Sequence, residues 1–290
     1  MKRKIVDVFL LAALALLLAA CSPRMLLVRT VADELAGSGG ADEEDLGLAR
    51  DAAAFHLKLS EQVLRQTPAH LALAEAVTGG FTQYAYAFIA FDADKQESKD
   101  ARAAQRQRER AARMYARAHR HAMAALEAAQ PGFAKALAGG TASVPADQVG
   151  LAYWGAAAWA GAISLSKDRP DTVADLPLAV SLAQLAYARD PGHGQGALAA
   201  LMGTLEAARL GGSAAQAATY FDQATGLGGG RNAGVFVARA EALALPAGDR
   251  PGFEALLRRA LVAADAQRDL GNQAMRERAQ WLLDTIDDRF

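Results

Sequence analysis

The apolar residues of this chain recur every three or four positions, the period of an α-helix, and no stretch shows the period of two that marks a strand. The clearest helix is predicted from Asp100 to Ala129. At 100° per residue its arginines fall in one narrow sector, opposite alanines and Leu126. The sector contains Arg102, Arg106, Arg113, Arg117 and Arg120. It is interpreted either as a solvated face paired with acidic residues elsewhere or as a site for anions or headgroups.

Two long helices are predicted before this one. The first covers about 42–66 and ends before Thr67-Pro68, because the residue before a proline disfavours helical backbone. The second covers about 68–91 and contains Gly79-Gly80. Glycine inside a helix costs about 1 kcal/mol relative to alanine. The glycine pair therefore predicts either a kink or a close crossing with another helix.

The second half of the chain has a repeating pattern. Small and bulky residues recur at spacings of four and three, as in the second helix of a tetratricopeptide repeat. The positions are Ala179, Ala183, Ala186 and Pro191; Ala217, Phe221 and Ala224; and Phe253, Leu257 and Ala260. The register is degenerate, since Phe253 is large where a small residue is expected and Ala183 is small where a bulky one is expected. A last helix at about 272–288, carrying Trp281, Leu282 and Ile286, is expected to cap the array.

Together these patterns predict an all-α fold, a tetratricopeptide-like helical-repeat solenoid or bundle with a C-terminal capping helix. Composition agrees: 52% of the residues are hydrophobic but only 7% are aromatic, with alanine supplying much of the difference. The formal net charge of −1 argues against nucleic-acid binding.

The first 20 residues have the form of a lipoprotein signal peptide. Positive residues at 2–4 precede an apolar stretch at 8–18 that is too short to span a bilayer comfortably. The lipobox pattern LAAC follows at 18–21, and Cys21 is the only cysteine, which excludes a disulfide framework. We expect a signal peptide at 1–20, a lipidated tether and loop at 21–45 and a helical domain at 46–290. The alternative is a plain secretory signal with an incidental cysteine. Acylated Cys21 would hold the periplasmic protein at a membrane by its lipid alone, and Ser22 favours the outer membrane.

No catalytic motif fits its context. The S-x-x-K match at 164–167 lies near a helix end and lacks its S-D-N and K-T-G partner motifs. The glycine-rich run 192–196 follows a helix where a dinucleotide loop would follow a strand. His119 and His121 diverge by about 200° on a helix and cannot chelate one ion together. We therefore predict no enzyme activity, metal or cofactor, and keep a hydrolase using Ser164 as a minor alternative.

Three segments carry a resemblance to a known family. They are YWGAAAWAGAISLSKDRPDTVADLP at 153–177, LAYARDP at 185–191 and GLGGGRNAG at 226–234. From about residue 71 to 290 the chain resembles the T-component lipoproteins of tripartite ATP-independent periplasmic (TRAP) transporters. The resemblance implies a tetratricopeptide-like protein that forms homotrimers and works beside the periplasmic solute-binding P-component. Subunit contacts are then expected at Gly79-Gly80 or at the Trp154/Trp159 segment.

Aromatic rings beside cationic side chains suit a carboxylate ligand, and the resemblance implies organic acids as the transported class. The candidate ligand-binding residues are Tyr153, Trp154, Trp159, Lys167, Arg169 and Arg231. The alternative is that both tryptophans are core residues and that the charges solvate loops. We expect a lipid-anchored accessory protein that docks the P-component and sequesters its ligand; a generic tetratricopeptide scaffold of envelope assembly is the alternative function.

Overall fold

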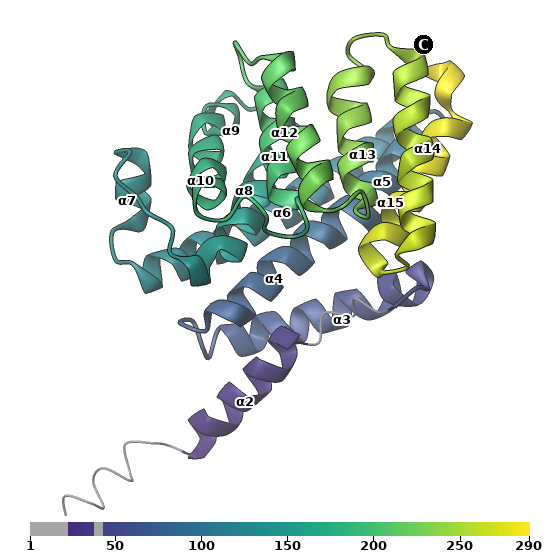
Figure 1. Ribbon diagram of the computed structural model, residues 1–290. Coiled ribbons are helices and arrows are strands. Elements are labelled where there is room, and N and C mark those ends of the chain that lie inside the picture. Colours follow the sequence, from purple (N-terminus) through teal and green to yellow (C-terminus); the bar gives the residue numbers. More distant parts are fainter. Residues whose placement is uncertain (1–22, 38–42) are drawn as a thin grey trace, which may run out of the picture.

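The computed structural model describes residues 23–37 and 43–290 (Figure 1). The predicted signal peptide and Cys21 lie outside the described residues. All regular secondary structure in the described part is helical, which confirms the all-α prediction. None of the helices in these two ranges has the length and apolar character needed to cross a bilayer.

The segment expected to be tether and loop contains a helix, α2 (Pro23–Gly37), which packs on α3 and α4. Ala32 is fully buried in this contact. Asp33 accepts a hydrogen bond of 2.9 Å from Nε2 of His70, and Nδ1 of the same imidazole accepts from the Leu73 amide at the start of α4. A single histidine thus caps α4 and fastens α2 to it.

Helix α3 (Leu46–Leu64) is followed by α4 (Leu71–Tyr84), a π-helical segment η1 (Ala85–Ala90) and α5 (Phe91–Gln96). The prediction of one regular helix over 68–91 is therefore wrong at both ends. The glycine pair forms a close crossing, because a Cβ at Gly79 would lie 2.9 Å from the Trp154 ring. The helix continues through Gly79 and changes to π geometry only at Ala85.

Helix α6 (Ala101–Ala129) matches the predicted range closely, because Asp100 caps it and its alanine face is buried. The chain then forms α7 (Phe133–Ala138), η2 (Ala146–Gln148), α8 (Val149–Ser164), α9 (Pro170–Val173) and α10 (Leu176–Arg189). Helix α8 lies at the centre and contacts α4, α6 and α10. Its small residues allow this: a Cβ at Gly155 would meet Ala122 at 2.8 Å, and one at Gly161 would meet the Tyr115 ring at 2.8 Å.

The remaining helices continue the stack in chain order. They are α11 (Ala197–Ala208), α12 (Ala214–Leu227), α13 (Ala233–Arg239) with the π-helical η3 (Ala240–Ala244), α14 (Arg250–Ala266), α15 (Leu270–Asp284) and η4 (Ile286–Asp288). The predicted small–bulky–small positions are the fourth, eighth and eleventh residues of α10, α12 and α14, and all of them are fully buried. The side chains of Ala183 and Phe253 differ in size from the small–bulky–small pattern, but the register of the pattern is the same in the three helices.

Helix α15 does more than cap the last pair. Leu282 and Ile286 pack into the α13–α14 core as predicted. The Trp281 ring also reaches Phe91 of α5, with centroids 5.4 Å apart in an edge-to-face arrangement. Figure 1 shows this helix beside α5, which belongs to the first half of the chain. The C-terminal helix therefore joins the two halves of the chain, which a terminal cap of an open array does not do.

Arg278 of α15 is the polar centre of this junction, and its side chain is only 11% exposed. It donates to Glu241 of η3 at 2.6 Å and to Asp94 of α5 at 3.2 Å, and its guanidinium faces the Tyr86 ring of η1 at 5.2 Å. Burial would lower the pKa of Arg278, but Tyr86, Glu241 and Asp94 raise it well above its usual range. Both π-helical segments thus contact one buried cation.

Replacing this cation should loosen the junction. We expect Arg278→Leu to reduce the free energy of unfolding by roughly 3 kcal/mol, because Glu241 and Asp94 lose their buried partner. Urea unfolding followed by circular dichroism measures the change. The control is Arg276→Leu on the same helix, whose exposed pair with Asp265 should contribute less than about 1 kcal/mol. Equal effects of the two substitutions would contradict the assignment.

Candidate functional site

The second turn of α8 brings together two of the predicted ligand residues. The Tyr153 and Trp154 rings lie 4.7 Å apart between centroids, and Trp154 rests on Gly79 of α4. The Tyr153 ring also lies 5.4 Å from the imidazole of His193, in the loop between α10 and α11. Glu75 of α4 completes a group that we call the α8 aromatic cluster: Glu75, Tyr153, Trp154 and His193.

Glu75 is the chemically distinctive member of this cluster. Its half-buried carboxylate lies directly against Gly150, so that any side chain at that position would collide with it. Burial raises the pKa of Glu75, and the nearby His193 lowers it. Burial also raises the pKa of Tyr153 to about 12. Neither the Glu75 carboxyl nor the Tyr153 hydroxyl has a hydrogen-bond partner within the described residues, and both side chains are partly exposed.

Trp159 lies one and a half turns further along α8, in the core. It is 8% exposed, and its ring packs on His119 of α6 with centroids 4.1 Å apart. Burial lowers the pKa of His119 to about 4, so this imidazole is neutral at physiological pH. Trp159 therefore fills space between α6 and α8, away from the surface.

Lys167 and Arg169 lie beyond the C-terminal end of α8, and both are exposed. At about 1.5 Å per residue, the last residue of the helix, Ser164, lies roughly 16 Å from Tyr153. The Ser164 hydroxyl donates a 2.9 Å hydrogen bond to the Gly161 carbonyl, as expected at a helix end. These two cations and the α8 aromatic cluster thus occupy opposite ends of one helix.

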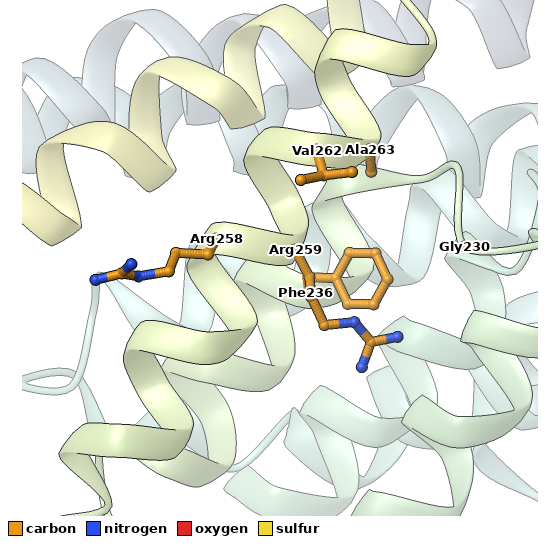
Figure 2. A pocket seen from close by; sticks show the side chains of 6 residues that line it. All are labelled: Gly230, Phe236, Arg258, Arg259, Val262 and Ala263. Carbon is orange, nitrogen blue, oxygen red and sulfur yellow. The ribbon is translucent and has the colours of Figure 1, made fainter.

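Arg231 lies on a different surface, in the loop between α12 and α13. Its backbone carbonyl accepts a 3.1 Å hydrogen bond from Asn272, while the residue itself is exposed. The preceding residue, Gly230, lines an open groove of about 280 Å³ between α13 and α14. Figure 2 shows the Arg259 guanidinium against the Phe236 ring, at 4.4 Å from its centroid, with Arg258 directed away from both.

The predicted residues therefore do not form one site. Tyr153 and Trp154 lie together, and Trp159, Lys167, Arg169 and Arg231 lie in three other places. Sequence reasoning missed Glu75 and His193. A weak signal existed for Glu75. It lies four residues before Gly79, just as Gly150 lies four residues before Trp154, and these residues form two contacts between α4 and α8, Glu75 with Gly150 and Gly79 with Trp154. Neither segment alone shows that the two helices pair.

A second polar group lies on α3, where Glu61 is 2% exposed. Arg117 donates to it through Nε at 2.5 Å and His121 through Nε2 at 2.9 Å. Lys58 of α3 and Arg65, just past its end, approach at 2.7 and 3.1 Å. Burial would raise the pKa of Glu61, but hydrogen bonds from Arg117, Lys58 and His121 outweigh it and lower the pKa to about 2. This carboxylate stays ionised and ties α6 to α3.

The fold of the described residues is that of an all-helical stack in which most helices pack against the next one along the chain. The family model for the TRAP transporter T-component matches residues 42–290, and the chain belongs to this family. It is also similar to an uncharacterised protein of Treponema pallidum (strain Nichols), with 29% identity over 267 residues, covering 86% of this chain and 81% of the relative. Members of this family are accessory components of transporters.

The Glu61 group predicts a specific acid sensitivity. A lowered pKa adds stability that is complete above the unfolded value and disappears as the pH falls through the folded value, here between about pH 5 and pH 2. From the size of the shift this contribution is roughly 3 kcal/mol at neutral pH. Urea unfolding across that range should show the loss in the native protein and a flatter profile for Glu61→Gln. Glu109→Gln, an exposed change on α6, is the control and should keep the native profile.

Proposed function

We propose that this protein is a periplasmic accessory component of a TRAP transporter, held at the outer membrane by a lipid on Cys21, that docks the solute-binding P-component. The single observation that carries the proposal is the family match over 42–290. The helical stack supports it, since stacked helices expose extended surfaces suited to protein docking. The tetratricopeptide character is part of the proposal and is supported by the shared register of α10, α12 and α14.

The ligand part of the proposal centres on the α8 aromatic cluster. An organic acid there would stack its apolar part on Tyr153 and Trp154 and accept a hydrogen bond from the Tyr153 hydroxyl. The Glu75 carboxyl, which lies against Gly150, is a further polar group that such a ligand could contact. Lys167, Arg169 and Arg231 are exposed, and we propose them for contacts with the ligand or the P-component at the periphery.

Homotrimer formation is a further part of the proposal. Gly79 and Trp159 are buried inside the protomer, and we propose another surface for the subunit contacts. Helix α3 offers an apolar stripe at intervals of four, three and four residues: Leu48, Ala52, Phe55 and Leu59. Phe55 is 75% exposed, Leu48 57% and Leu59 42%. Such a stripe on one helix face is typical of a surface covered by another helix.

Docking and ligand retention can be measured separately. We expect the full-length protein to bind the purified P-component in biolayer interferometry with a Kd near the micromolar range, typical of a transient complex. Tyr153→Phe/His193→Ala should leave this Kd unchanged and reduce the organic acid retained in equilibrium dialysis. Trp154 is left intact because it supports the contact with Gly79. Absence of docking by the native protein would refute the proposed function.

The α3 stripe makes its own prediction. Phe55→Glu places a charge in the apolar stripe and should convert the oligomer to protomers in light scattering, with unchanged helical content. The matched change Gln66→Glu, on an exposed residue just past the end of α3, should leave the oligomer intact. An unaltered mass for Phe55→Glu would remove this surface from consideration.

A further inference from the structure

Helix α6 carries a row of arginines that the rest of the protomer leaves without partners. The row consists of Arg102, Arg106, Arg110, Arg113 and Arg120, all exposed. Across the ranges that the structure covers, none of them has a carboxylate within 4.0 Å or a hydrogen bond. The sequence interpretation of a face paired with acidic residues elsewhere therefore applies only to Arg117, which binds Glu61.

Two other arginines of α6 do have carboxylate partners in the protomer. Arg108 points toward α5 and pairs with Glu97 and Asp94, and Arg117 points toward α3 and pairs with Glu61. Arg108 and Arg117 are thus paired with carboxylates of neighbouring segments, and the five arginines of the row are not. On the outward side, Glu109 is the acidic residue within the row, and it receives a hydrogen bond from Gln105.

The row is unfavourable for the isolated helix. Its members are separated by four, four and three residues from Arg102 to Arg113, so that like charges are neighbours on the helix surface. Arg102 also lies in the first turn, which contains no acidic residue, and there a positive charge opposes the helix dipole. An anionic surface on another molecule would offset both effects.

The chemistry of the arginine row favours one of two anionic partners, a protein surface rather than a lipid surface. From Arg102 to Arg113 the row extends over about 16 Å of rigid helix, and guanidinium groups bind carboxylates with two parallel hydrogen bonds. Helices that lie on membranes combine basic residues with apolar side chains that insert into the lipid. No large apolar side chain of α6 is exposed. A folded protein surface rich in Asp and Glu fits these features better than a lipid surface.

We infer that the arginine row of α6 is the docking surface for an acidic face of the solute-binding P-component. The inference rests on the proposed function and adds the location and the charge of the contact to it. Complementary charge accelerates association and makes affinity depend on salt. The complex should therefore weaken as ionic strength rises.

The test measures the Kd between the full-length protein and the P-component at several salt concentrations. Arg106→Glu/Arg110→Glu should weaken binding about tenfold or more at low salt and flatten the salt dependence. The control is Arg29→Glu/Arg189→Glu, which makes the same change in net charge at exposed arginines of α2 and α10 and should stay within about twofold of the native Kd. Arg106→Lys/Arg110→Lys should keep the salt dependence. Circular dichroism and thermal unfolding verify that each variant is folded.

The outcomes separate the two proposals. If the native protein docks and Arg106→Glu/Arg110→Glu docks equally well, the arginine row is not the surface and the proposed function stands. If the native protein does not dock at any salt concentration, the proposed function fails and this inference fails with it. Cosedimentation with vesicles containing phosphatidylglycerol is the remaining arm. Loss of vesicle binding in Arg106→Glu/Arg110→Glu, with docking unchanged, would assign the row to lipid headgroups and overturn the inference.

Discussion

The burial of one guanidinium ties the C-terminal helix α15 to the first half of the chain. Arg278 reaches Asp94 from the first half and Glu241 from the second, and so adds a polar link to the contact of Trp281 with Phe91. A buried cation costs desolvation, so the site is stable only because two carboxylates and the Tyr86 ring surround it. The two π-helical segments contribute Tyr86 and Glu241 to this site. Irregular backbone is thus concentrated where the halves must meet around a charge.

Close helix packing explains why so much of the chain is alanine and glycine. Helix α8 packs mainly against α4, α6 and α10, and its glycines leave room for Ala122 and for the Tyr115 ring. In the same way, Gly203 of α11 leaves room for the Phe221 ring of α12. Small residues set short distances between the helices, so that few positions can hold an aromatic ring. Trp154 and Trp159 occupy such positions and fill the space between helices.

Periodicity predicted the helices and their buried faces, because a face is a local property of the sequence. The range of α6 and the shared register of α10, α12 and α14 followed from it. Partners between helices could not be predicted in this way, so Glu75 and His193 were missed and Lys167 and Arg169 were placed with Tyr153. The helix α2 was also missed. Its apolar and polar residues are only weakly separated onto opposite faces, and its packing depends on His70 of a later segment.

The charged side chains form two sets: those that are paired within the fold and those that are left to contact another molecule. Glu61, Glu241 and Asp94 each receive arginine donors from another helix, and these pairs set the positions of α3, α5, α6 and α15. Such pairs are already satisfied, and a partner molecule that competed for them would have to break the fold. Helix α6 carries both kinds of charge within the part of the chain that the structure describes. Arg108 and Arg117 form ion pairs inside the fold, and five exposed arginines of the same helix form none, so one helix supplies both internal ties and free surface charge.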